Sequence, residues 1–123
     1  MAPRGFRLLL LGPIIAVVAA CGSAEPPAAA ELPDDVGPVT ADPTVAVVDN
    51  RFEPDEVVVE VGTEVTWVWE GRAAHNVVGD GFESDVMVAG DFAHTFDTTG
   101  SFTYVCTLHP GQEGVVHVVP AGG

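Results

Sequence analysis

The stretch of the sequence with the clearest potential for chemistry runs from Tyr104 to Gly114, and it holds a thiol at Cys106 and an imidazole at His109. The spacing Cys-x-x-His lets both side chains face one ion. A second imidazole, His75, lies upstream and would complete a trigonal set of two histidines and one cysteine. Such a set suits copper in an electron-transfer site. The sequence therefore predicts a metal centre that binds one copper ion per chain.

Each of these residues also has an ordinary interpretation. Alone, Cys106 could be a buried apolar thiol, and His75 or His109 a surface residue at the end of a strand. The combination of all three favours a metal site. Zinc could occupy the same set, but copper binds such sites more tightly when both metals are equally available.

The charge of the chain limits its partners. Its 123 residues include 18 Asp and Glu against 4 Lys and Arg. All 18 acids follow Cys21 and face only Arg51 and Arg72, so residues 21–123 carry a net charge of 2 minus 18, or −16. Such a surface repels nucleic acid and favours redox partner proteins with a basic docking face. It is equally compatible with a simple role in solubility.

The N-terminus has the features of an exported lipoprotein. Arg4 and Arg7 precede an apolar run over residues 8–20, which is shorter than the roughly 20 residues that a membrane span needs. Residues 18–21, Val-Ala-Ala-Cys, resemble a bacterial lipobox. We therefore expect a signal peptide over residues 1–20 and a lipid on Cys21, which would anchor the protein to the outer face of the cytoplasmic membrane. The alternative is an ordinary signal peptide that leaves Cys21 as a free thiol.

The remaining chain divides into a linker and one domain. Residues 21–42 are rich in Gly, Ala, Pro and acid and contain no aromatic residue, which predicts a flexible, disordered linker behind the lipidated cysteine. Residues 43–120 are enough for one domain with a modest core. Only Cys106 lies inside that domain, so it has no partner for an intramolecular disulfide. Nothing marks an oligomer interface, and we expect a monomer.

Short strands and frequent turns fill the domain, and no stretch has the periodicity of an amphipathic helix. In one strand Val65, Trp67 and Trp69 share a face. Gly62-Thr63 is expected to join this strand to the preceding one as a two-residue hairpin. The segments expected as strands are residues 44–48, 56–61, 64–70, 92–96, 102–106 and 115–119. The pattern predicts an all-β, Greek-key β-sandwich.

Four stretches of the domain resemble the cupredoxins, the type 1 blue copper proteins, and among them the plastocyanin, amicyanin and halocyanin group. The stretches are residues 52–54, 62–67, 74–78 and 100–110. The resemblance covers roughly Thr44 to Val119 and implies a cupredoxin-like sandwich with copper bound by His75, Cys106 and His109. It also implies an electron carrier that cycles between Cu(I) and Cu(II) and is not an enzyme. The alternative function is copper binding and delivery without redox cycling.

The resemblance also indicates a fourth ligand. Amicyanin-like loops follow the pattern Cys-x-x-His-x-x-Met-x-Gly, and the register of Cys106, His109 and Gly114 places Gln112 at the methionine position. Gln112 is therefore the candidate axial ligand, a weak oxygen donor of a kind known among blue copper sites. The alternative is that Gln112 points into solvent and the copper has three ligands.

Two further residues follow a ligand directly and are expected to support it. In the family, residues at the positions of Asn76 and Thr107 form hydrogen bonds between the two ligand loops, and such contacts fix metal ligands in place. Ordinary turn chemistry is the alternative for both residue types. The other two histidines, His94 and His117, do not fall on ligand positions, and His117 is expected to face outward from the last strand.

Overall fold

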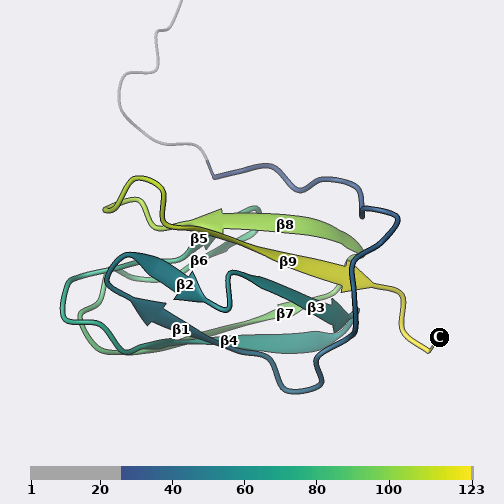
Figure 1. Cartoon of the computed structure of the whole chain (residues 1–123), viewed down its shortest axis with the longest axis horizontal. Coiled ribbons are helices and arrows are strands. Elements are labelled where there is room, and N and C mark those ends of the chain that lie inside the picture. The colour runs from purple at the N-terminus through teal and green to yellow at the C-terminus, as the bar shows by residue number, and fades with distance from the viewer. Residues whose placement is uncertain (1–25, 123) are drawn as a thin grey trace, which may run out of the picture.

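The computed structural model describes residues 26–122, which form two β-sheets packed face to face (Figure 1). The sheets have the strand orders β2-β1-β4-β7 and β3-β9-β8-β5-β6. The strands are β1 (Thr44–Val48), β2 (Arg51–Glu53), β3 (Glu56–Glu60), β4 (Thr63–Trp69), β5 (Val78–Gly79), β6 (Phe82–Glu83), β7 (Gly90–Phe96), β8 (Gly100–Val105) and β9 (Glu113–Val119). The predicted all-β sandwich is confirmed. Within residues 26–122, no helix is long and apolar enough to cross a membrane.

The core lies between the sheets because alternate residues of each strand point inward. Trp67 of β4 is fully buried, and its ring centroid lies 5.3 Å from that of Tyr104 and 5.7 Å from that of Phe82. A side chain at Gly114, opposite Tyr104 on β9, would overlap the tyrosine ring, so glycine is required there. The core also includes Val45, Val47, Phe52, Val57, Val59, Val65, Phe96, Val116 and Val118. This packing holds the strand ends that carry the site.

The hairpin predicted at Gly62-Thr63 is wrong. β3 pairs in parallel with β9, whereas β4 pairs with β1 and β7, so the two consecutive strands lie in different sheets. At the corner between them Gly62 has a φ of 90°, which glycine adopts without strain. The amide of Val61 donates to the carbonyl of Val119 at 2.9 Å, and the amide of Gly62 donates to the carbonyl of Phe96 at 2.7 Å. The two strands therefore bring their apolar faces to the core from opposite sides.

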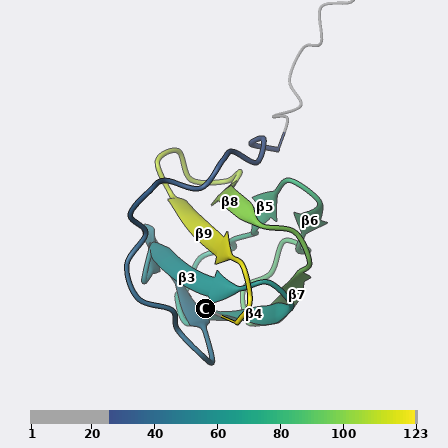
Figure 2. The same cartoon turned by 90° about the vertical axis from the view of Figure 1, so that its right-hand side faces the viewer.

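Residues 26–42 run along the outside of the sandwich, past β8, β9 and β3 (Figure 1, Figure 2). Ala30 exchanges two backbone hydrogen bonds of 2.8 Å with Ser101 of β8, and the amide of Thr40 donates to the carbonyl of Val58 in β3 at 2.8 Å. The linker predicted over residues 21–42 stays a prediction, and its described part makes these contacts. The signal peptide and the lipidation site Cys21 lie outside the described residues.

His117 lies between these two points of contact, on the outer face of β9. The register places it beside Ser101 on one side and Val58 on the other. It faces outward from the strand as expected, yet it is only 7% exposed. Its Nδ1 lies 2.7 Å from the hydroxyl of Ser101 and its Nε2 lies 3.2 Å from the carboxylate of Glu56. Its polar atoms are thus satisfied within the outer face of the sheet.

Candidate metal centre

Three loops meet at the left-hand end of the sandwich in Figure 1: residues 49–50 after β1, residues 70–77 after β4, and residues 106–112 after β8. Two backbone hydrogen bonds close the last loop. The amide of Cys106 donates to the carbonyl of Gln112 at 3.0 Å, and the amide of Gln112 donates to the carbonyl of His109 at 3.1 Å. His75 exchanges two backbone hydrogen bonds of 2.9 Å with Met87. The candidate ligands are therefore fixed through their own backbones.

The three side chains predicted from the sequence converge. One ligand atom each of His75, Cys106 and His109 lies within 4.8 Å of the others. The sulfur of Cys106 is 3.7 Å from Nδ1 of His75 and 3.5 Å from Nδ1 of His109. His75 and Cys106 are buried, and His109 is half-buried. A thiol and two imidazole nitrogens that face one point form a donor set that fits copper.

Gln112 completes this group with an oxygen atom. Its side chain is 1% exposed, and its Oε1 lies 2.9 Å from Nδ1 of His75. Its amide nitrogen donates to the carbonyls of Val48 and Arg51, at 2.9 Å and 3.0 Å. Because both N–H groups of the amide have acceptors, its orientation is fixed and Oε1 faces the imidazole of His75. The side chain lies inside the site and not in solvent.

Asn76 and Thr107 connect the two loops that carry the histidines and the cysteine. The amide of Thr107 donates to Oδ1 of Asn76 at 2.8 Å, and Nδ2 of Asn76 donates to the hydroxyl of Thr107 at 2.9 Å. The same hydroxyl lies 3.2 Å from Oδ1. This reciprocal contact holds the position of His75 relative to Cys106.

Asp49 also contacts the site, and sequence reasoning missed it. Its Oδ1 accepts hydrogen bonds from the amides of Arg72 and Ala73, at 2.7 Å and 2.9 Å, and lies 3.2 Å from Nε2 of His75. These contacts lower the pKa of Asp49 to about 2. The largest effect is the hydrogen bond from the amide of Ala73, followed by those from the ring of His75 and the amide of Arg72. An acid in a turn after a strand is common, so the sequence offers no signal for this contact.

The other histidines lie away from the metal centre. His94 of β7 stacks on Phe82 with ring centroids 4.9 Å apart, and burial lowers its pKa, against the opposing effect of Asp97. His117 lies on the outer face of β9, as described above. Neither belongs to the group of possible metal ligands among the described residues.

Comparisons with known proteins agree with this site. Residues 43–119 match the family model for copper binding proteins of the plastocyanin/azurin family, so the chain belongs to that family and copper is its cofactor. Halocyanin from Natronomonas pharaonis is 44% identical over 70 residues, which are 50% of this chain and 42% of that protein. The chain thus spans less than half of that relative's length. Amicyanin from Paracoccus versutus is 34% identical over 104 residues, covering 78% of this chain and 74% of that protein.

A solved structure shows the same architecture. A purple cupredoxin from Nitrosopumilus maritimus matches with a TM-score of 0.59 and 25% sequence identity, over 63% of this chain and 100% of that chain. The resemblance to the cupredoxins that the sequence indicated is therefore confirmed, together with the fold and the metal.

Proposed function

We propose that this protein is an extracytoplasmic electron carrier with one type 1 blue copper site. In this proposal His75, Cys106 and His109 bind the copper and Gln112 is its axial ligand. The observation that carries it is the convergence of one thiol and two imidazole nitrogens, with a fixed amide oxygen beside them. The bound copper supplies one-electron chemistry between Cu(I) and Cu(II).

The protein contributes rigidity to this function. Three sets of contacts fix the donor atoms before metal binds. They are the reciprocal hydrogen bonds between Asn76 and Thr107, the backbone hydrogen bonds of His75 with Met87, and the backbone hydrogen bonds that close the loop after Cys106. A donor set that does not move between oxidation states lowers the reorganisation that each electron transfer requires. Such preorganisation is the main contribution that a protein makes to a cofactor of this kind.

The electron is proposed to pass through His109. This residue is half-buried, whereas His75 is fully buried, so His109 is the ligand nearest to solvent. Leu108 is 41% exposed and Pro110 is exposed beside it. An apolar rim around a partly exposed ligand lets a partner approach closely without displacing strongly bound water.

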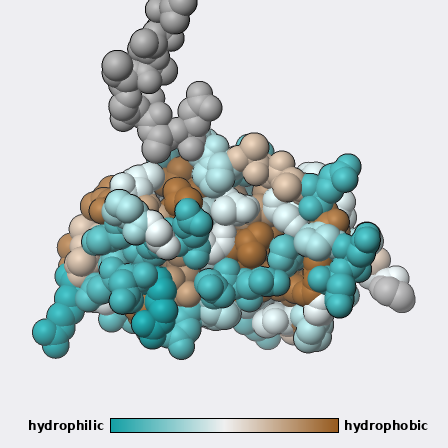
Figure 3. All heavy atoms as spheres, turned by 45° about the horizontal axis from the view of Figure 1, so that its top comes forward, coloured by the Kyte–Doolittle hydropathy of each residue, from teal (hydrophilic) through white to brown (hydrophobic). Residues whose placement is uncertain are grey.

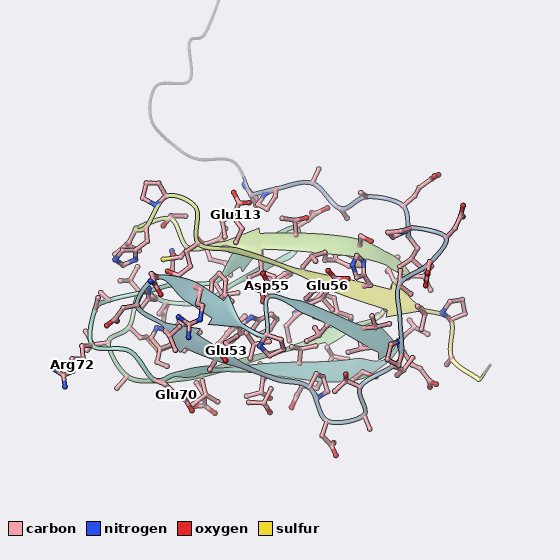
Figure 4. The ribbon with its side chains drawn as sticks, viewed as in Figure 1. Glu53, Asp55, Glu56, Glu70, Arg72 and Glu113 are labelled. Carbon is pink, nitrogen blue, oxygen red and sulfur yellow. The ribbon has the colours of Figure 1, made fainter. Side chains whose placement is uncertain are left out.

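The partner is proposed to carry a basic docking face. Glu53, Asp55, Glu56 and Glu113 come from neighbouring ends of β2, β3 and β9 (Figure 4). Three of them, Asp55, Glu56 and Glu113, line one surface hollow of about 290 Å³. The face seen in Figure 3 is mostly hydrophilic, and the whole chain has a net charge of −14. Opposite charge on the partner would accelerate the encounter.

The location follows from the N-terminal sequence. We propose export through the signal peptide of residues 1–20 and attachment of the monomer to the outer face of the cytoplasmic membrane through a lipid on Cys21, with residues 21–42 as the linker. The similarity to a halocyanin and an amicyanin supports a role in electron transfer. The lipid anchor rests on the sequence motif alone.

Stopped-flow mixing of the copper-loaded protein with a basic cytochrome c tests the carrier function. We expect reversible one-electron exchange whose second-order rate falls as ionic strength rises. Neutralising the acidic group with E53Q, D55N, E56Q and E113Q should slow the reaction more than the charge-matched set E64Q, E83Q, D91N and D97N. Copper transfer to a chelator without reversible electron exchange would favour copper delivery instead.

A further inference from the structure

The turn between β1 and β2 supports the metal centre from two directions. The carbonyls of Val48 and Arg51, on either side of the turn, hold the amide of Gln112. Asp49, inside the turn, places its carboxylate against the far nitrogen of His75. Two of the four candidate ligands thus depend on one short turn that contributes no ligand of its own.

The contact with Asp49 supports the tautomer of His75 that can bind a metal. A neutral imidazole carries its proton on one nitrogen and a lone pair on the other, and a carboxylate can only accept a hydrogen bond. Nε2 of His75 lies 3.2 Å from Oδ1 of Asp49, whereas Nδ1 lies near the sulfur of Cys106 and 2.9 Å from Oε1 of Gln112, an oxygen that also only accepts. Both nitrogens of the copper-free ring therefore face acceptors. When a metal takes the lone pair of Nδ1, the remaining proton is on Nε2 and Asp49 accepts its hydrogen bond. This is the tautomer that metal binding requires.

The carboxylate is held in place although the Asp49 side chain is 50% exposed. The amides of Arg72 and Ala73 donate to the same oxygen that faces His75. A side chain at Gly71 would overlap that oxygen, so glycine lets the bend close over it. A carboxylate fixed by backbone donors differs from a surface ion pair, whose side chains must lose freedom to meet.

We propose that Asp49 is a positioning residue for the copper site, which orients the ring of His75, accepts the hydrogen bond of its Nε2 proton when Nδ1 binds the metal and lowers the reduction potential. This inference rests on the proposed function, because it requires His75 to be a ligand. Carboxylates that accept from a ligating histidine raise the basicity of that ligand. A negative charge beside the ligand also stabilises the more positive, oxidised state of the site. Asp49 acts through His75 and does not itself touch the metal.

The test compares D49N, D49A and the control E70Q, which removes an exposed carboxylate from the same bend. D49N keeps an oxygen that can accept the hydrogen bonds but loses the charge, so it should raise the reduction potential. D49A also loses the hydrogen bond, so its affinity for Cu(II), measured by competition with a chelator, should fall about 10–100-fold. E70Q should change both quantities much less.

Nuclear magnetic resonance of the copper-free protein tests the positioning separately from copper binding. We expect the Nε2 proton of His75 to exchange slowly with water in wild type and E70Q and faster in D49A. If wild type shows this proton but binds no copper at the thiol, the proposed function fails while the positioning stands. If D49N and D49A match E70Q in potential, affinity and proton exchange, the role of Asp49 is refuted.

Discussion

Replacing Gln112 with methionine separates the two roles that the structure gives this side chain. One end of the amide is held by the carbonyls of Val48 and Arg51, and the other end faces Nδ1 of His75. Methionine has a similar length and offers a thioether to the metal, but it cannot donate a hydrogen bond. The Q112M variant should therefore be less stable without copper and have a higher reduction potential with it.

Both effects can be given a size. Each of the two lost hydrogen bonds contributes a net of about 0.5–1.5 kcal/mol, so the free energy of unfolding should fall by about 1–3 kcal/mol. An oxygen donor stabilises Cu(II) over Cu(I) more than a thioether does. If that preference is worth about 1.5–3 kcal/mol, like a hydrogen bond to a charged group, the potential should rise by roughly 65–130 mV.

Urea unfolding of the copper-free protein measures the first quantity, and spectroelectrochemistry of the loaded protein measures the second. L108M is the matched control, because it places a methionine in the same loop at a position that is 41% exposed. It should change neither quantity. A Q112M variant that loses stability but keeps the wild-type potential would refute axial ligation while leaving the structural role intact.

Two further predictions concern the loop contact and the half-buried histidine of β7, His94. N76A removes the hydrogen bonds to Thr107 and should lower the free energy of unfolding by about 1–3 kcal/mol, with an unchanged urea midpoint as the contrary result. Burial lowers the pKa of His94 below its usual 6.5. As the pH falls, His94 is therefore protonated more readily in the unfolded chain than in the folded chain, and this favours unfolding. Stability should therefore fall as the pH drops through about 6.5, and the thermal midpoint should fall more in wild type than in H94Q between about pH 7.5 and about pH 5.5. Equal falls would contradict this assignment.

The longer strands were predictable from the sequence pattern, but the short strands β2, β5 and β6 were not, and neither were the neighbours of each strand. Val65, Trp67 and Trp69 alternate with more polar residues, and this pattern identifies the buried face of β4. Alternation says nothing about which strand lies alongside, and the pairing of β3 with β9 rather than with β4 depends on contacts far apart in the sequence. The hairpin was therefore predicted where the chain instead crosses from one sheet to the other.

The metal centre likewise has parts that the sequence predicts and parts that it does not. The grouping of His75, Cys106 and His109 followed from residue types and spacing, because a thiol and imidazoles are uncommon and their chemistry is specific. The bridge between Asn76 and Thr107 was expected from the resemblance. The support of Gln112 was not predictable, since its amide is held by two backbone carbonyls, which every residue possesses. The contact of Asp49 with His75 likewise joins two loops that only the folded chain brings together.

The burial of His117 had a similar cause. Residues 26–42 have the composition of a linker, and nothing in that composition indicates that Ala30 and Thr40 bond to β8 and β3. The hydrogen bond of His117 to Ser101 depends on the register of β8 against β9. Long-range register is set by the assembled core and not by the local sequence.

The most direct test of the central claim is the visible absorption and electron paramagnetic resonance spectrum of the purified chain after one equivalent of Cu(II) is added. A thiolate and two imidazoles on one copper predict an intense sulfur-to-copper absorption band and a narrow copper hyperfine splitting. Both should be lost in C106A and retained in C21A, which removes the other cysteine. A pale band with a broad splitting, or a blue spectrum that survives in C106A, would contradict the proposed site.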